Sequence, residues 1–383
     1  MERVRRQIHT DPELSNEEFA TTELLQTELR AGGISSISAI GATGVVAEVD
    51  GDPHGPIVAL RADIDALPIQ ERTDLPFKSR RDGVMHACGH DAHTAMLLGA
   101  MLAAAAMERL PGSIRGIFQP AEEAEPLGAR RVVDGGHVAG VRGAIALHVD
   151  PTTPTGTISL RDGEMMAASD TFEITIHGRH AHAGWPQDGV DAIAAAAAFV
   201  QQAQTVVSRR IDPRASTVIN FGSISGGAAN NIVCDEVVIT GVIRTLDEAI
   251  RPQLRQMLDD VLVGVCSPLG ASAELALHEG EPVLRNDPLL AGAIRRAGER
   301  VAGVDVLELA QPTMNGEDFA FYGEHIPTAM AWIGCRNESL GYTYPLHHPM
   351  FAVDEGVLMK GAAVLLETAL DVLANADSAF SLE

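Results

Sequence analysis

Four side chains that commonly bind metal ions lie within a short stretch near residue 90. The stretch contains His86, Cys88, His90 and His93, and a single glycine separates Cys88 from His90. A thiolate together with imidazoles suits Zn²⁺ or a similar divalent cation. One histidine beside a core helix is usually a packing or surface residue, but this density of donors favours a metal site. The stretch holds too few ligands for a complete site, so others are expected from elsewhere in the chain.

Carboxylates follow an apolar segment that is typical of a strand. Asp63 and Asp65 come after segment 57–60, and because they are two residues apart their side chains project from the same face. The carboxyl ends of strands in α/β sheets are where binding sites are usually built. A solvated strand end is the alternative to a functional role here.

Two later strand-like segments deliver polar residues to the same kind of position. Segment 113–118 is followed by a proline, which forces the chain out of the sheet, and then by Glu122 and Glu123. In such a loop one carboxylate can bind a metal ion while the other accepts a proton from the metal's water, although an isolated pair is most often a solvated loop. Segment 144–147 ends in His148, which could be a further ligand.

The pattern of strand and helix segments that must position these residues predicts two domains. The length of 383 residues also favours two domains over one. Alternating strand and helix segments in residues 1–168 and 281–383 predict an α/β/α domain with a mixed sheet. Residues 169–280 follow the order βαββαβ, a ferredoxin-like unit that we expect to be inserted into the first domain. Near the N-terminus, Ser15 and Glu18 have the spacing of a capping box, which predicts a helix from Ser15.

Composition excludes some classes of protein. Lys plus Arg is 28 and Asp plus Glu is 52, which gives a formal charge of −24. With no basic stripe to reverse this field, nucleic acid is not expected as a partner. The four cysteines do not form a disulfide framework, and neither a signal peptide nor a membrane-spanning run is apparent. A soluble, cytoplasmic protein with no membrane partner is therefore expected.

Six short motifs together resemble those of a known enzyme family. In chain order they are Arg61–Pro68, His86–His93, Gln119–Glu123, His148–Pro151, Asn315–Phe319 and Leu346–Pro349. This series is similar to the M20 metallopeptidase and aminoacylase family and covers essentially the whole chain. The cysteine points to the amidohydrolase branch, which includes hippurate hydrolases and auxin-conjugate hydrolases.

The resemblance implies a metal centre with a general base at Glu122. The implied ligands are Cys88, His90, Glu123, His148 and His347. The choice of His347 over His348 rests on the His-x-Pro form of the motif. Five ligands that include a thiolate able to bridge imply two divalent ions, zinc or manganese. Candidates for orienting the ligand imidazoles are Asp63, Asp65 and Asp91.

The resemblance also assigns roles within residues 169–280, which become a lid and dimerisation domain. His182 matches a histidine that reaches across a dimer and stabilises the oxyanion in the partner's active site. His180 stands where relatives commonly have glycine and could compete for that role. Asn231 and Arg244 match positions that hold the substrate's carboxylate. The loop after Asn231 lacks the proline of the usual motif. A homodimer is expected.

The implied activity is metal-dependent hydrolysis of an amide bond. The expected substrates are small N-acyl amino acids or short peptides, with Glu122 taking a proton from the metal-activated water. A dipeptidase or carboxypeptidase with the same centre is the alternative enzyme. A metal-binding protein without turnover is a second class, and it would not require a base such as Glu122.

Overall fold

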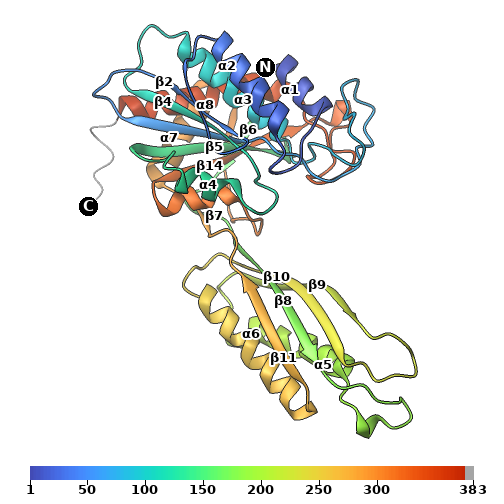
Figure 1. Ribbon diagram of the computed structural model, residues 1–383. Coiled ribbons are helices and arrows are strands. Elements are labelled where there is room, and N and C mark those ends of the chain that lie inside the picture. The colour runs from blue at the N-terminus through green and yellow to red at the C-terminus, as the bar shows by residue number, and fades with distance from the viewer. Residues whose placement is uncertain (376–383) are drawn as a thin grey trace. The chain divides into compact units, whose positions relative to one another are not determined.

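Contacts in the computed structural model, which describes residues 1–375, divide the chain into two compact units (Figure 1). Of the described residues, the first unit contains Met1–Met165, Arg285–Gln311 and 318–375. The second unit contains Met166–Leu284 and the short segment Pro312–Glu317. The insertion predicted from the sequence, residues 169–280, lies within the second unit.

An eight-stranded mixed sheet organises the first unit, in the order β1-β2-β4-β3-β5-β14-β6-β13. Strand β3 pairs parallel to both β4 and β5, and β5 pairs parallel to β14, whereas β2 is antiparallel to β1 and β4. The predicted α/β fold with a mixed sheet is confirmed. The strands are β1 Ser36–Ala39, β2 Val45–Val49, β3 Ile57–Asp63, β4 Ser113–Gln119, β5 Val141–Pro154, β6 Thr157–Leu160, β13 Asp305–Glu308 and β14 Thr328–Arg336.

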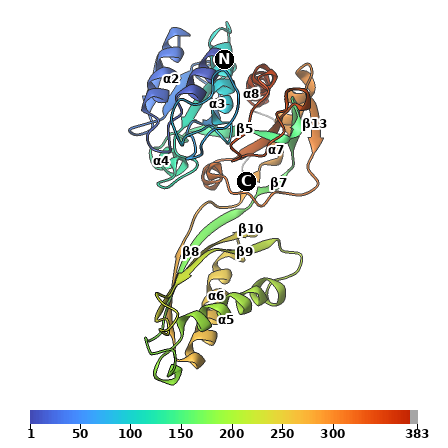
Figure 2. The same cartoon turned by 90° about the vertical axis from the view of Figure 1, so that its right-hand side faces the viewer.

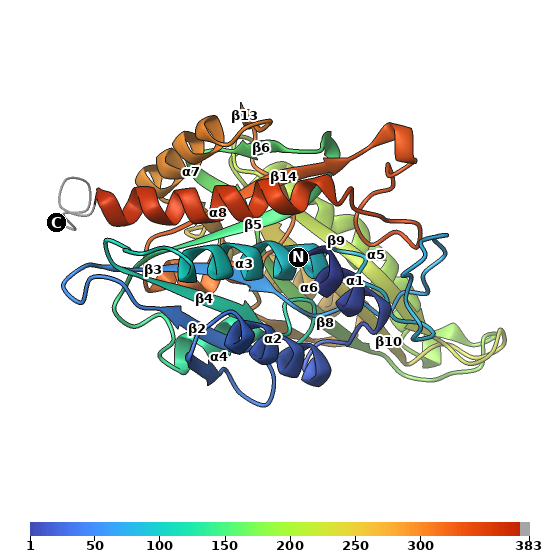
Figure 3. The same ribbon diagram turned by 90° about the horizontal axis from the view of Figure 1, so that it is seen from above.

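Helix α3 is the central helix of this unit. Its residues are buried around most of its circumference, which is the pattern of a helix enclosed by other elements. It packs on β3 and β4 and against α1 and α8, and Figure 3 shows α3 and α8 side by side across the strands. The helices are α1 Glu2–Thr10, α2 Phe19–Ala31, α3 His90–Ala105, α4 Gly128–Asp134, α7 Pro288–Arg300 and α8 Gly356–Ala374, with short 3-10 turns at Asp318–Glu324 and Glu338–Leu340.

The strand order reverses at β3, because the chain passes from β3 to β4 on one side and then to β5 on the other. Connections leave the carboxyl ends of such strands in opposite directions, and ligands bind in the crevice that results. Strand β3 ends at Asp63 and β4 at Gln119. The pairing of β3 with β5 ends at Arg61 opposite Ala146, so His148 lies just beyond it at the same edge.

The second unit is a four-stranded antiparallel sheet in the order β11-β8-β10-β9. Figure 2 shows helices α5 and α6 on one face of this sheet. The elements are β8 Ala168–His177, a 3-10 turn Pro186–Asp188, α5 Ala192–Thr205, a π turn Val206–Arg210, β9 Thr217–Gly226, β10 Glu236–Thr245, α6 Arg251–Cys266, a 3-10 turn Ser267–Leu269 and β11 Ser272–His278. Two short strands, β7 Gly163–Met166 and β12 Leu284–Asn286, pair separately. Within residues 1–375, no helix has both the length and the apolar character that crossing a bilayer requires.

The predicted capping box at Ser15 and Glu18 is wrong, because α2 begins only at Phe19. Both side chains are engaged in tertiary contacts instead. The Ser15 hydroxyl donates to Asp65 at 2.6 Å, and the Glu18 carboxylate accepts from the backbone N–H of Ala121 at 2.8 Å. These long-range polar contacts override the local helix signal and tie the N-terminal segment to the loops that carry the carboxylates.

Candidate metal centre

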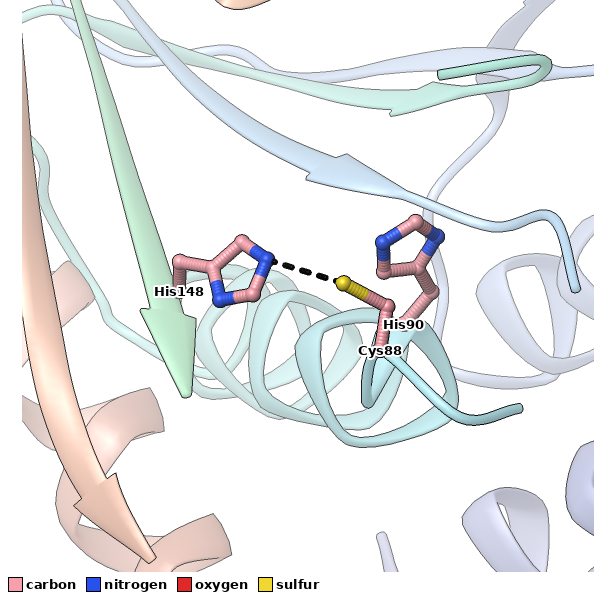
Figure 4. Close-up of side chains that lie close together, drawn as sticks. All are labelled: Cys88, His90 and His148. Carbon is pink, nitrogen blue, oxygen red and sulfur yellow. Dashed lines mark hydrogen bonds between the residues drawn. The ribbon is translucent and has the colours of Figure 1, made fainter. Parts of the chain in front are cut away.

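Three of the predicted ligands converge at the carboxyl end of the sheet. Figure 4 shows Cys88 and His90, from the start of α3, close to His148, from β5. The sulfur of Cys88 lies 3.4 Å from Nε2 of His148. All three side chains are buried, and their donor atoms lie within 4.8 Å of one another, which is close enough for one ion to contact all of them.

Gly89, between Cys88 and His90, makes this approach possible. Its φ of 88° is in the left-handed region that glycine adopts readily. A Cβ atom added at this position would lie 2.4 Å from a methyl group of Val149, which is next to His148 on β5. Only glycine therefore allows the start of α3 to lie this close to the strand that carries His148.

Hydrogen bonds from the other ring nitrogen fix the orientation of both buried ligand histidines, His90 and His148. Nδ1 of His90 donates to Asp65 at 3.1 Å, and Nδ1 of His148 donates to the backbone carbonyl of Val149 at 2.9 Å. These bonds assign the proton to Nδ1 and leave Nε2 of each ring for a metal ion, an arrangement that is typical of metal-binding histidines.

Glu123 and His347 complete the cluster from two loops. Nε2 of His347 lies 3.3 Å from Glu123 Oε1, and Nε2 of His90 lies 3.8 Å from the same oxygen. His347 and Ala121, which precedes the two glutamates, have positive φ angles of 61° and 51°. Positive φ at a residue other than glycine is strained by about 1–3 kcal/mol and persists where surrounding contacts enforce it, commonly at functional sites.

His347 rather than His348 faces the cluster. Nδ1 of His348 accepts from the backbone N–H of Met350 at 3.1 Å, and its ring stacks on Tyr344 with centroids 4.5 Å apart. The His-x-Pro form of the motif had favoured the same residue in the sequence.

Unpaired buried atoms in the cluster fit a divalent cation. Nε2 of His90 is buried without a hydrogen-bond partner among the described residues, and Oε1 of Glu123 is buried with only the 3.3 Å contact to Nε2 of His347. Leaving such groups unpaired costs about 1–3 kcal/mol each, and both are metal-binding atoms. Two groups of donors overlap at one thiolate, Cys88 with His90 and His148, and Cys88 with Glu123 and His347. The residues present therefore fit the group that the sequence predicted.

Burial and neighbouring charges shift the pKa values of two proposed ligands. Burial raises the pKa of the Cys88 thiol well above its usual value, and the carboxylates of Glu123 and Glu122 raise it further. Burial opposes protonation of His90, but the charges of Asp63, Asp65 and Glu123 outweigh this effect and raise the pKa of His90 to about 10. A positive charge is thus favoured between these carboxylates, and a divalent cation would supply it.

Asp63 and His93 are hydrogen-bonded to each other and to the elements around the cluster. Nδ1 of His93 donates to Asp63 at 2.6 Å, and Nε2 of His93 accepts from the backbone N–H of Val149 at 2.9 Å, so both ring nitrogens are engaged. Asp63 also accepts from Arg61 at 2.9 Å. His86 is buried farther back, where burial lowers its pKa to about 4.

A buried network that the sequence reasoning missed supports these residues. Arg61 donates to Gln119 at 3.1 Å and to Asp318 at 2.8 Å, and Gln119 donates in turn to Asp318 at 2.8 Å. Arg61, Gln119 and Asp318 each belong to one of the six motifs. Their presence in those motifs is the signal that could have identified them. A charged residue that is buried is costly unless it is paired, so charged residues within apolar motif segments are expected to have buried partners.

Trp332, on β14, packs beside the cluster. Its ring lies edge-on to the ring of His148, with centroids 4.9 Å apart. The indole is 8% exposed and closes the apolar side of the site.

The second unit contains the remaining predicted residues. The segment around His182 pairs with the segment around Asn231, through a bridge between His182 and Ile232 and a hydrogen bond of 3.0 Å from the Ala183 N–H to the Asn231 carbonyl. Arg244 lies near the opposite end of β10 and donates to the Met314 carbonyl at 2.8 Å. The structure therefore brings His182 and Asn231 together but separates both from Arg244.

The two histidines of the predicted lid motif differ in their contacts. His180 lies 2.8 Å from Asp235, in an exposed ion pair. Nδ1 of His182 accepts from the Gly184 N–H at 3.0 Å, so its Nε2 carries the proton and can donate. The His182 ring lies 5.1 Å from that of Trp185, which is 60% exposed.

Comparison with known proteins agrees with this donor set. The Peptidase family M20/M25/M40 matches residues 59–371. The chain belongs to this family. It is 41% identical to the N-acetyl-L-cysteine deacetylase of Bacillus subtilis, over 99% of this chain and 89% of the relative. It is 38% identical to the IAA-amino acid hydrolase ILR1-like 5 of Arabidopsis thaliana, over 98% and 87%.

A solved M20 structure is similar over almost the whole length. The YXEP protein of Bacillus subtilis, described as a dinuclear metal binding peptidase, matches with a TM-score of 0.84 and 36% identity over 97% of each chain. The predicted family and enzyme class are confirmed: the protein is a metal-dependent hydrolase of the M20 family.

Proposed function

We propose that this M20 protein hydrolyses the amide bond of N-acyl amino acids with the help of two divalent metal ions. One observation carries the proposal. Carboxylate oxygens of Glu122 and Glu123 and a ring nitrogen of His90 lie within 4.8 Å of one another, so a candidate base stands beside the metal donors. A base next to metal-activated water is what hydrolysis requires and metal storage does not. The named relatives, a deacetylase and an amino acid conjugate hydrolase, support the substrate class.

The metal ions would be held by Cys88, His90, Glu123, His148 and His347, with the Cys88 thiolate shared between the two donor groups. When bound, they would polarise the amide carbonyl and make a water molecule more acidic. Glu122 accepts a proton of that water as the water oxygen bonds to the carbonyl carbon, and it transfers the proton to the nitrogen of the leaving amine as the C–N bond breaks. His182 donates from Nε2 to the oxyanion, and Asn231 and Arg244 bind the carboxylate of the amino acid.

Zinc is the metal that we favour over manganese, because a thiolate is a soft ligand. A cytoplasmic location is also proposed. All four cysteines are free thiols, which supports a reducing compartment.

The length of one strand supports a homodimer. Asn231 precedes β10, and Arg244 is near its end, eight residues beyond Glu236. At about 3.4 Å per residue, this separates the two side chains by roughly 27 Å or more, too far for both to contact one amino acid. We therefore propose that each active site combines Arg244 of one chain with His182 and Asn231 of a second copy.

The edge of the sheet supports this second copy. Strand β9 is an edge strand, and Val218 and Ile224 on it are 40% and 58% exposed. An exposed, apolar edge strand invites pairing with another chain.

Mixing two inactive variants tests the shared site. Mixing His182→Ala with Glu122→Gln should restore part of the activity, because mixed dimers contain one site with both residues intact. Sedimentation at the same concentrations checks the mass. An intact dimer without any recovered activity would contradict a site shared between chains.

A dipeptidase or carboxypeptidase is the second candidate, favoured by the description of the similar solved structure as a peptidase. The metal chemistry is the same, so only substrate preference separates the two. Release of free amino acid from N-acetyl, N-benzoyl and indoleacetyl amino acids should be compared with release from simple dipeptides, each with chelator and with added Zn²⁺ or Mn²⁺. Faster dipeptide cleavage would favour the peptidase. Bound metal without turnover of any substrate would contradict both.

A further inference from the structure

Two buried basic side chains of helix α1, Arg5 and His9, contact the first turn of α3. Nε of Arg5 donates to Asp91 Oδ2 at 2.9 Å, and Nδ1 of His9 contacts the same oxygen at 2.9 Å. Asp91 directly follows His90 in the first turn of α3. Arg5 and His9 are each 1% exposed and Asp91 is 0% exposed, so water does not weaken these contacts.

His9 is also held from its other side. Its Nε2 lies 3.3 Å from Glu71, a carboxylate that additionally accepts from the backbone N–H of Ser79 at 2.7 Å. An imidazole with a carboxylate oxygen at each ring nitrogen satisfies both only as the imidazolium. Edge-on contact with Phe77, 5.5 Å between centroids, closes one side of the ring.

Arg5 connects the same turn to a second helix. Its Nη1 lies 3.0 Å from Glu355, the residue that precedes α8. Helices α3 and α8 pack against each other, so α1 fixes the beginnings of both. Buried charges are costly to desolvate, and removing one partner of such a pair is strongly destabilising because it leaves the other charge uncompensated.

We propose that Arg5 and His9 are positioning residues of the metal centre. They hold Asp91, and with it the first turn of α3, in the rotation at which His90 and Cys88 face Glu123 and His148. Asp65 contacts the His90 ring directly, whereas the α1 pair holds the side chain of the next residue, Asp91. This inference rests on the proposed metal centre.

Cobalt binding tests the inference without an assay of activity. A Cys88 thiolate bound to Co²⁺ gives a charge-transfer absorption band, so titration of the apoprotein with Co²⁺ against a competing chelator reports both affinity and ligand geometry. We expect His9→Gln to weaken cobalt binding by about tenfold, the lower end of the range found when direct partners of metal ligands are removed, because His9 acts through Asp91. Arg5→Lys, which keeps the charge, should recover part of the affinity lost in Arg5→Gln.

Arg3→Gln is the matched control. Arg3 lies on the same helix, and its side chain is 65% exposed and pairs with Glu28. This variant should bind cobalt as the wild type does. Thermal unfolding of each apoprotein separates the two possible roles: a purely structural role would lower stability and leave the cobalt affinity of the folded protein unchanged. That result in His9→Gln would overturn the inference.

Asp91→Asn provides a second test if His9→Gln does not fold. It keeps the shape of the side chain, removes the charge and should weaken cobalt binding in the same way. Wild-type affinity and an unchanged band in Asp91→Asn would overturn the inference. Weakened cobalt binding in a protein that hydrolyses no amide would support the positioning role while contradicting the proposed function. Failure of the wild type to bind cobalt through Cys88 would remove the centre and the inference together.

Discussion

The metal-ligand candidates His90 and His148 of the first unit and the substrate-binding candidates His182 and Asn231 of the second unit differ in how firmly they are held. In the first unit, His90 and His148 are buried and each has its second ring nitrogen bonded. In the second unit, His182 and Asn231 are exposed. Metal ligands must be in place before the ion arrives, whereas residues that contact a substrate must be reachable from solvent. The difference indicates where mutation should disturb metal binding and where it should disturb only turnover.

Glu122→Gln should give the largest effect and separate the two properties within the first unit. Loss of a general base costs about 10²- to 10⁴-fold in kcat. The metal content should stay at the wild-type level, because Glu122 is not among the proposed ligands. Metal analysis and kcat measured on the same sample check this. Glu125→Gln, an exposed residue of the same loop, is the control. A Glu122→Gln enzyme that retains its rate would contradict the mechanism.

His182→Ala should reduce kcat by about 10²- to 10³-fold, the usual cost of one oxyanion donor. Metal affinity should not change, since His182 is exposed and is not among the proposed metal ligands. His180→Ala is a close control, because that side chain pairs with Asp235 instead. If both variants lose activity equally, His182 has no special role.

His9 predicts a pH dependence of stability that the second unit should not share. Burial opposes protonation of His9, but Asp91 and Glu71 outweigh it and raise its pKa from 6.5 to about 9. A raised histidine pKa stabilises the folded state fully below the unfolded pKa, and this contribution disappears as pH rises through the folded pKa. The contribution of His9 alone to the stability of the apoprotein, on the order of 3 kcal/mol, should therefore be lost between pH 6.5 and 9.

Thermal unfolding in chelator across that pH range tests the His9 prediction. His9→Gln should be less stable at pH 6.5 and should show a flatter profile. Parallel profiles for the wild type and the variant would show that another group is responsible.

Arg244→Lys should have the smallest effect. It tests whether a change in the second unit alters substrate binding and leaves metal binding intact. Lysine keeps the charge but cannot form the paired hydrogen bonds of a guanidinium with a carboxylate. KM should rise about tenfold, which corresponds to about 1.4 kcal/mol, with kcat and metal content unchanged. Arg179→Lys, exposed in the same unit, should leave KM unchanged. A fall in kcat alone would contradict the assigned role.

Sequence patterns predicted the architecture of the first unit because its signals are local. Apolar segments that lead to Asp63, Asp65 and His148 marked one edge of the sheet, where β3 ends at Asp63 and His148 lies just beyond the pairing of β3 with β5. The length of β5 was misjudged. His148 was expected at the strand's end, but the strand continues through Pro154, since pairing with β14 extends to that proline.

The network behind the centre could not be read from local patterns. Arg5 and His9 contact Asp91 across 86 and 82 residues of sequence, so no spacing rule connects them. Ser15 carried a misleading local signal for the same reason: its hydroxyl is bonded to Asp65, 50 residues away. Pairing of buried charges depends on the folded arrangement and can be assigned only once the helices are in place.

The two tryptophans of the chain make it possible to observe each unit optically without a label. Trp332 is 8% exposed beside His148, and Trp185 is 60% exposed beside His182. A shielded indole emits at shorter wavelength than a hydrated one, so the intrinsic fluorescence spectrum contains two separable contributions. The shorter-wavelength emission of Trp332 then reports on events around His148, and the longer-wavelength emission of Trp185 reports on events around His182. A single stopped-flow trace could thus give the order in which a metal ion and a substrate engage the enzyme.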